Sequence, residues 1–221
     1  MTRSARSVAI LAGGRGLRLG PETPKALRVL RGRTLLERAL AIADAWSDDV
    51  AVCAPNGLDV GPSGARLVRD PAAFGPWPGP LVALAWALEQ AARPWSLVLA
   101  VDMPLAQEAL FDLLWSRRLD PVTPAEKSPR DAPALGVVPW RRHGPEPLLA
   151  LYRREAGPAL LAMAQAGERA AVRAVPALPL VRIPEAELRI ADPLALSFEN
   201  CNTPEEWRRI EEQLDAGTGS R

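Results

Sequence analysis

Short runs of apolar residues recur through the first half of the chain and alternate with patterns of helical spacing. Residues 8–11, 50–54 and 96–101 (SLVLAV) are predicted to be buried strands, and residues 66–68 a shorter one. A continuous apolar run of this length is typical of a strand that is covered on both faces, as in a parallel sheet.

Helical patterns lie between these strands. Thr34 to Glu37 has the form of a capping box, in which the two side chains satisfy free backbone amides, so a helix is predicted to begin there. Apolar residues at helical spacing then continue it: Leu35, Leu36, Ala39, Leu40 and Ala43. Further helices are predicted over residues 81–92 and around residues 110–114. This alternation predicts a three-layer α/β/α fold, Rossmann-like, with a mixed but mostly parallel sheet.

The second half of the chain has a less regular pattern. Residues 119–147 hold many prolines and charges and are predicted to form loops, with strands near residues 134–138 and 148–152. Residues 157–167 are expected to form a short helix. The loop after the first strand is likewise expected to run, without further structure, to about Arg33.

A final helix is predicted from a second capping box, Thr203 to Glu206, to about Leu214. No repeat and no linker divides the sequence. A single domain over residues 1–221 is therefore expected, with flexible ends at about residues 1–6 and 215–221.

Composition narrows the classes of function. The 221 residues are 48% hydrophobic and carry a net charge of +1, which gives no support to a broad nucleic-acid-binding or membrane-binding surface. No apolar run approaches the roughly 18 residues that cross a bilayer. No signal peptide is recognisable, so a cytoplasmic location is expected.

Few side chains are available for metal or thiol chemistry. Cys53, Cys201 and a single histidine, His143, argue against a disulfide framework or a zinc site. The chemistry is therefore expected to use oxygen and nitrogen groups. The seven tryptophans show no stacking periodicity and are expected in the core or in interfaces.

The stretch LAGGRGLRLGPETPK, residues 11–25, follows the first predicted strand. Ligands of open α/β sheets bind beyond the carboxyl ends of the strands, where this loop would lie. Gly13 and Gly14 allow backbone N–H groups to approach phosphate oxygens, and Arg18 and Lys25 add positive charge. A triphosphate is the ligand that such a loop favours.

Lys25 stands out because only two of the 27 basic residues are lysines, the other being Lys127. A compact ammonium suits a crowded phosphate better than a planar guanidinium, although a solvent-exposed lysine is the ordinary alternative. Arg15, also in the loop, is as well explained by a solvent-facing position.

Two common phosphate-binding motifs do not fit this loop. A Walker A loop needs GK[ST] within the glycine run, whereas Lys25 follows a proline well beyond Gly14. The dinucleotide fingerprint G-x-G-x-x-G would need a glycine at position 19, where the chain has Leu19.

Two carboxylates follow predicted strands. Asp102 comes directly after residues 96–101, where it could cap a turn or bind Mg²⁺, which is commonly held by one or two carboxylates together with substrate phosphates. Asp70 follows residues 66–68 and precedes Pro71, so an ordinary turn is its alternative.

These motifs, in this order, resemble those of the nucleotidyltransferases, and within that superfamily the molybdenum cofactor guanylyltransferases. LAGGRGLRLG resembles the signature loop of the family, and PGPLVALAWAL its GPL-x-G motif and helix. LAVDMPL is similar to the CDMP strand end, and FENCNTPEEW to the F-x-N-x-NTPE close. The resemblance covers nearly the whole chain.

The resemblance implies a fold of the nucleotide-diphospho-sugar transferase type and transfer of GMP from GTP to the terminal phosphate of molybdopterin, with release of pyrophosphate. It implies that Mg²⁺ binds Asp102 and that Arg18 and Lys25 bind phosphates. The other nucleotide-binding positions that it implies are Leu11, Ala12, Gly13, Gly14, Asp70, Asn200 and Asn202. Partners would be GTP, molybdopterin and proteins of cofactor biosynthesis or delivery.

Alternatives stay open at this point. The ending ETPKAL is closer to the sugar-phosphate nucleotidyltransferases, so a sugar-phosphate or cytidine-type nucleotidyltransferase is the second candidate. A GTP-binding adaptor that delivers the cofactor without catalysis is a third. Asn200 and Asn202 could instead cap the final helix.

Overall fold

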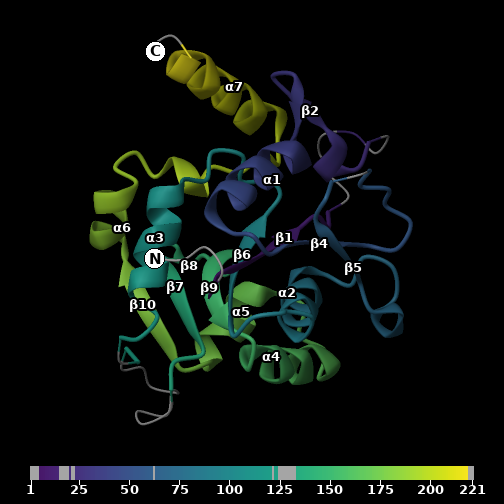
Figure 1. Ribbon diagram of the computed structural model, residues 1–221, viewed down its shortest axis with the longest axis vertical. Coiled ribbons are helices and arrows are strands. Elements are labelled where there is room, and N and C mark those ends of the chain that lie inside the picture. Colours follow the sequence, from purple (N-terminus) through teal and green to yellow (C-terminus); the bar gives the residue numbers. More distant parts are fainter. Residues whose placement is uncertain are drawn as a thin grey trace.

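An eight-stranded mixed sheet forms the centre of the protein, and helices cover both of its faces (Figure 1). The computed structural model describes residues 5–14, 20, 23–61, 63–120, 122–123 and 133–218, and the structural statements below concern these residues. The strand order is β10-β7-β9-β6-β1-β4-β5, with β8 paired to β7. The strands are β1 (Ser7–Leu11), β4 (Val50–Ala54), β5 (Arg66–Arg69), β6 (Trp95–Ala100), β7 (Gly136–Arg141), β8 (Gly144–Pro145), β9 (Leu149–Arg153) and β10 (Leu180–Pro184).

The helices divide into two layers. One hydrophobic core includes side chains from α1 (Leu35–Trp46), α3 (Glu108–Ser116), α6 (Glu185–Ala191) and α7 (Pro204–Thr218). The core on the opposite face of the sheet includes α2 (Pro80–Glu89), α4 (Ala156–Gln165) and α5 (Ala171–Ala174). The predicted three-layer fold with a mostly parallel, mixed sheet is confirmed.

The pairing of the strands places several loops on one edge of the sheet. β1 runs parallel to β4 and β6, and β4 runs parallel to β5, so their carboxyl ends point the same way. β9 is antiparallel to β6 and β7 and therefore begins at this edge. The edge is the carboxyl edge of the sheet, and it carries the candidate site.

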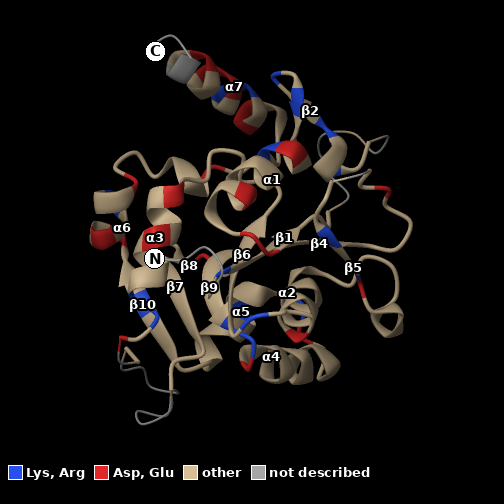
Figure 2. Cartoon of the chain, in the orientation of Figure 1, with Lys and Arg blue, Asp and Glu red and all other residues tan. Residues whose placement is uncertain are grey.

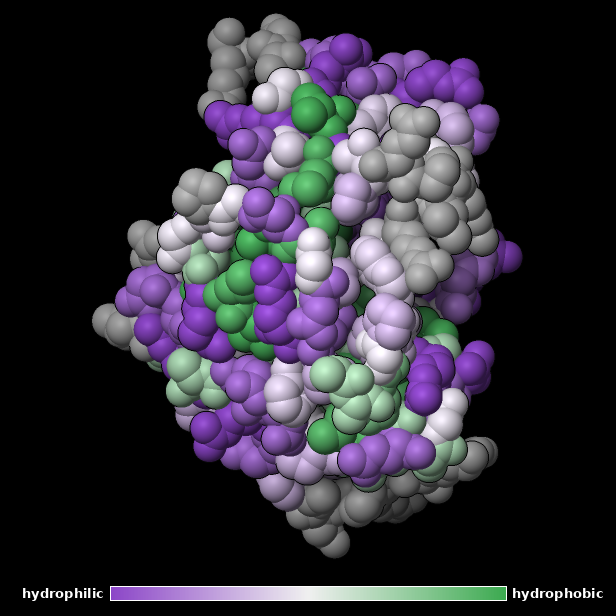
Figure 3. Space-filling view, turned by 90° about the vertical axis from the view of Figure 1, so that its right-hand side faces the viewer, coloured by the Kyte–Doolittle hydropathy of each residue, from purple (hydrophilic) through white to green (hydrophobic). Residues whose placement is uncertain are grey.

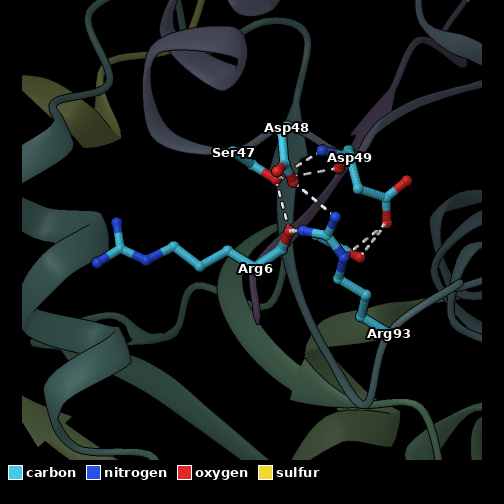
Figure 4. Close-up of polar contacts among 6 residues, drawn as sticks. Arg6, Ser47, Asp48, Asp49 and Arg93 are labelled. Atoms are coloured by element: carbon cyan, nitrogen blue, oxygen red, sulfur yellow. Dashed lines mark hydrogen bonds and ion pairs between the residues drawn. The ribbon is translucent and has the colours of Figure 1, made fainter. Parts of the chain in front are cut away.

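The opposite edge is fixed by a polar cluster (Figure 4). Arg93, just before β6, donates to the carbonyl oxygen of Arg6, just before β1, and pairs with Asp48 at 2.6 Å. Ser47 Oγ donates to the same carbonyl at 2.6 Å, and Ser7 Oγ donates to Asp49. These contacts hold the beginnings of β1, β4 and β6 together.

Both predicted capping boxes are present. Thr34 Oγ1 accepts from the amide of Glu37 at 3.1 Å, and the Thr34 amide donates to Glu37 Oε2 at 2.6 Å. Thr203 and Glu206 form the equivalent pair at the start of α7. The local sequence signals for these two helix starts were therefore sufficient.

Other expectations about secondary structure were incomplete. The loop expected to reach Arg33 contains a 3₁₀ turn, Lys25–Leu27, and a hairpin of β2 (Val29–Leu30) and β3 (Arg33–Thr34). α2 ends at Glu89, before residue 92. β10 and α6 were not predicted, because residues 175–184 contain three prolines, which favour a loop assignment.

The C-terminal helix is longer than predicted. α7 continues past Leu214 to Thr218, so the predicted end of the helix at about Leu214 was too early. Asp215 pairs with Arg31 at 2.7 Å. Ile210 is fully buried, whereas acidic and basic segments both occur on the exposed part of the helix (Figure 2).

On the right-hand side of the molecule in Figure 1, hydrophobic side chains form patches between hydrophilic ones (Figure 3). Val29 on β2 and Leu67 on β5 are among the exposed large hydrophobic residues. None of the described helices combines the length and the apolar composition that spanning a bilayer requires.

Thr34→Ala removes the hydroxyl that accepts a hydrogen bond from the Glu37 amide. We expect the free energy of unfolding to fall by about 1 kcal/mol, the typical cost of losing an N-cap, in a denaturant titration. Thr34→Ser keeps the hydroxyl and serves as the control, with stability close to the wild type. Equal loss in both variants would contradict a capping role.

Candidate functional site

A cleft of about 170 Å³ opens at the carboxyl edge of the sheet. Its walls come from the ends of β1, β5 and β6, the segment before β9, and the segment that leads into α2. The lining residues are Leu11, Gly13, Gly14, Asp70, Trp77, Pro78, Gly79, Pro80, Ala83, Ala100, Asp102 and Leu148. The cleft therefore joins segments that are far apart in the sequence.

Beside the cleft, Lys25 contacts the residue after β6 and the segment before α7 through its ammonium group. Its Nζ donates to Asp102 Oδ2 at 2.5 Å and to Asn202 Oδ1. Lys25 is buried, with only 6% of its surface exposed, whereas the Asp102 side chain is 21% exposed. A buried ammonium is stabilised only when it has such partners, so these contacts fix the position of the charge. The alternative of a solvent-exposed lysine is excluded.

Local structure places each of the three side chains. Pro24 leads into the 3₁₀ turn that begins at Lys25, and Asp102 follows β6 directly. The amide of Cys201 donates to the carbonyl of Asp102 at 3.0 Å, which fastens the segment before α7 to the end of β6. Thr203, and not Asn202, caps α7. The Asn202 side chain instead accepts a hydrogen bond from Lys25.

Gly13 and Gly14 differ in backbone conformation and in their surroundings. Gly14 has φ +147°, a backbone conformation that favours glycine, and a Cβ added there would lie 3.7 Å from Lys25 Cδ. Gly13 has no such conformation, and a Cβ there would meet no atom within 4 Å. Arg15 and Arg18 lie outside the described residues.

Asp70 follows β5 and lines the cleft. In the strand order, β5 and β9 lie on opposite sides of β1. The amide of Asp70 donates to the carbonyl of Ala54 at 3.1 Å, and Asn56 Nδ2 donates to the Asp70 carbonyl at 3.2 Å. Only 7% of its surface is exposed, and burial raises the pKa of its carboxyl above the ordinary value of 3.8. A buried carboxylate on the wall of a cleft is a candidate for ligand binding.

Four of the expected residues are not among those that line the cleft: Ala12, Lys25, Asn200 and Asn202. Ala12 is 1% exposed and packs in the core beneath α1, although its amide continues the β1 ladder by donating to Cys53. Asn200 does not contact Lys25 in the described contacts, because its Nδ2 donates to the Phe198 carbonyl at 3.3 Å. Leu11 does line the cleft.

Sequence reasoning missed several lining residues. Trp46, Trp95 and Trp115 are buried as expected, but Trp77 lines the cleft and is only partly buried. Leu148 also lines it, and its carbonyl accepts from the Ala100 amide at 2.8 Å. The cluster of prolines around Trp77 was the signal that an unusual loop was present.

The two cysteines do not supply a nucleophile. Burial raises the pKa of Cys53 to about 12, and it raises the pKa of Cys201 to about 12 as well. Both thiols are therefore protonated at neutral pH, and the site must work through oxygen and nitrogen groups.

Asp102 and Asn202 supply hard oxygen donors of the kind that suit Mg²⁺. In this structure Asp102 Oδ2 and Asn202 Oδ1 accept from the Lys25 ammonium. In the part of the chain that the structure describes, no group of three or more His, Cys, Asp or Glu side chains could hold a metal alone. The remaining ligands would have to come from substrate phosphates and water.

A larger groove, of about 650 Å³, lies between β2 and α7. Its lining residues are Thr23, Leu27, Arg28, Val29, Pro204, Trp207 and Arg208. It has neither a carboxylate nor a glycine in this lining, so the smaller cleft with Lys25 beside it is the candidate site.

The family model and the named relatives given below identify the chain as a nucleotidyltransferase. The crystal structure of 2-C-methyl-D-erythritol 4-phosphate cytidylyltransferase from Thermus thermophilus has the same fold, with a TM-score of 0.61 and 17% identity, covering 94% of this chain and 98% of that one. More particularly, the chain belongs to the family with the MobA-like NTP transferase domain, whose model matches residues 8–179.

Named relatives agree with this membership over most of the chain. It is 33% identical over 205 residues to the probable molybdenum cofactor guanylyltransferase of Synechococcus elongatus, covering 91% of this chain and 96% of that protein. The molybdenum cofactor guanylyltransferase of Desulfosudis oleivorans is 32% identical over 209 residues, with 94% and 95% covered. The crystal structure of molybdopterin-guanine dinucleotide biosynthesis protein A from Archaeoglobus fulgidus has a TM-score of 0.76 and 25% identity, with 95% and 99% covered.

Asp70→Asn tests the cost of keeping this carboxylate in the cleft. A folded-state pKa above 3.8 means that the contribution of Asp70 to stability is complete below pH 3.8 and is lost as the pH rises through the folded-state pKa. We therefore expect Asp70→Asn to unfold at higher denaturant than the wild type at pH 7.

The gain from Asp70→Asn should shrink as the pH falls below 3.8, when the wild-type carboxyl is protonated in both states. Asp59→Asn, at an exposed position, serves as the control and should show no comparable gain. A wild type at least as stable as Asp70→Asn at pH 7 would contradict the proposed burial cost.

Proposed function

We propose that this protein transfers GMP from GTP to the terminal phosphate of molybdopterin, forming the guanine dinucleotide cofactor and releasing pyrophosphate. The observation that carries the proposal is the Lys25–Asp102–Asn202 contact beside the glycine loop, at the edge of a nucleotidyltransferase sheet. The names of the relatives, over nine-tenths of the chain, support the guanylyl and molybdopterin specificity.

In this proposal the nucleotide lies in the cleft. Leu11 and Gly13 lie beside the base and ribose, Gly14 allows close approach of the backbone to the phosphates, and Asp70 bonds the nucleotide. Arg18 is assigned to the phosphates from the sequence. Ala12 acts through its place in the loop, because its side chain packs in the core.

Catalysis rests on charge and position. The buried Lys25 ammonium stabilises negative charge that develops on the triphosphate during displacement at the α-phosphorus. The acceptor phosphate is already an anion, so no strong general base is required, and the protonated thiols of Cys53 and Cys201 take no part. Holding the acceptor in line with the leaving pyrophosphate supplies the rest.

Asp102 and Asn202 are the residues that would hold a divalent cation, and we assign it as Mg²⁺ because the donors are hard oxygens. When bound, the ion neutralises charge on the triphosphate oxygens and helps to orient them. Asn200 is assigned to the same region through its place before Asn202. We place the reaction in the cytoplasm, where free thiols such as Cys53 and Cys201 persist.

The proposed reaction is tested by supplying GTP, CTP, ATP or UTP with Mg²⁺ and molybdopterin and measuring pyrophosphate release. We expect release with GTP well above that with the other three. A sugar 1-phosphate replaces molybdopterin in a parallel series. Release with a sugar 1-phosphate and none with molybdopterin would refute the proposal, and binding of GTP without any release would favour a non-catalytic adaptor.

Lys25→Arg keeps the positive charge but enlarges the group in a buried, crowded position. We expect kcat/KM to fall by about 100-fold or more, the scale of losing one preorganised donor. Lys127→Arg, at the other lysine of the chain, is the matched control and should retain wild-type turnover. Steady-state kinetics close to wild type for Lys25→Arg would show that the ammonium geometry is dispensable.

Asp102→Asn keeps the size of the side chain and removes its charge. The dependence of the rate on Mg²⁺ concentration should shift to much higher concentration, with kcat reduced by about 100-fold. Unchanged Mg²⁺ dependence would disprove the assignment of Asp102 as the metal ligand. Circular dichroism of the variant checks that the fold is intact.

A further inference from the structure

Trp77 is the only aromatic residue among those that line the cleft in the described part of the chain. It shares the lining with Gly13, Gly14 and Asp70, and it is partly buried, so its indole is neither a core side chain nor fully exposed. An indole offers a large rigid face on which a planar heterocycle can stack.

The backbone at Trp77 is strained. Its φ is +60°, a region that L-residues with large side chains rarely adopt, and it directly precedes Pro78, which restricts its conformation further. Such outliers persist only where the surrounding structure enforces them, and they cluster at ligand-binding positions. The strain makes Trp77 a candidate for a functional position, and its place in the cleft lining agrees with this.

Neighbouring segments hold this loop in place. Gly75 and Gly79 on either side have φ of +74° and +96°, and the amide of Leu81 donates to the carbonyl of Arg169 at 3.2 Å. The Arg169 guanidinium lies over the Phe74 ring, 5.8 Å from its centroid. Residues on both sides of Trp77 are thus anchored to the segment before α5, and the loop cannot relax freely.

We infer that Trp77 provides the aromatic face on which a planar heterocycle of the substrate stacks, and that this heterocycle is the nucleotide base. The inference rests on the proposed function. The base is favoured over the pterin because Trp77 lines the same cleft as Gly13, Gly14 and Asp70, the residues assigned to the nucleotide. Trp77 thereby joins the residues that bind the nucleotide.

Direct binding measurements separate the base from the phosphates. Titration calorimetry with GTP and with inorganic tripolyphosphate, both with Mg²⁺, is carried out on wild type, Trp77→Ala and Trp77→Phe. Loss of the ring in Trp77→Ala should weaken GTP binding about tenfold or more and leave tripolyphosphate binding unchanged. Trp77→Phe, which keeps a ring, should retain most of the affinity.

Two further variants guard against an indirect effect on the loop. Trp77→Gly removes the ring and suits φ +60°, so the backbone strain is relieved, and it should lose GTP affinity as Trp77→Ala does. Trp140→Ala removes an indole of β7 that lies over Arg182 rather than in the cleft, and it should bind GTP normally.

GTP binding by Trp77→Ala and Trp77→Gly at wild-type affinity would overturn the inference, as would equal weakening of tripolyphosphate binding. A raised KM for molybdopterin with unchanged GTP affinity would also overturn it, because the stacked ring would then be the pterin. Failure of the proposed function is distinguishable, since the wild type itself would then release no pyrophosphate from GTP and molybdopterin.

Discussion

The arrangement of the site depends on one buried ammonium group. Lys25 bonds to Asp102 and Asn202, and so joins the loop after β1, the end of β6 and the segment before α7. A buried charge without partners is costly, so the three segments are held in one geometry by the same group that faces the phosphates in the proposed reaction. A substitution at Lys25 would therefore affect both the arrangement of these segments and the charge that faces the phosphates.

The two edges of the sheet have different roles, one structural and one in the candidate site. On the edge away from the cleft, Arg93 and Ser47 bond the carbonyl of Arg6, which sets the relative positions of the strand beginnings (Figure 4). On the carboxyl edge, the loops carry glycines, a strained tryptophan, the buried Asp70 and the partly buried Asp102. A rigid sheet with functional loops at one end is the usual solution of open α/β folds.

The sequence was informative where structure is local. Buried strands such as β1 and β6 were recognised from apolar runs, and the helix starts at Thr34 and Thr203 from their capping boxes. Asp102 was found because it follows a strand on the ligand-binding edge, and Lys25 because it is one of only two lysines and ends the glycine loop. Trp77 was missed because its φ of +60° contradicts the preference of its own residue type and is enforced by distant contacts. The Asn202 contact was not derivable, since it spans a sequence separation of 177 residues.

The separation of 177 residues between Lys25 and Asn202 also sets the order in which parts of the site are synthesised. Chains emerge from the ribosome N-terminus first, and the strands that bear the glycine loop and Asp102 are complete long before residues 200–218 are synthesised. Lys25 and Asp102 can meet at that stage, but Asn202 arrives only with the last segment, fastened by the Cys201 amide and followed by α7. A chain that ends before residue 202 therefore lacks the Asn202 contact to Lys25, whereas the residues of the Lys25–Asp102 ion pair are both present.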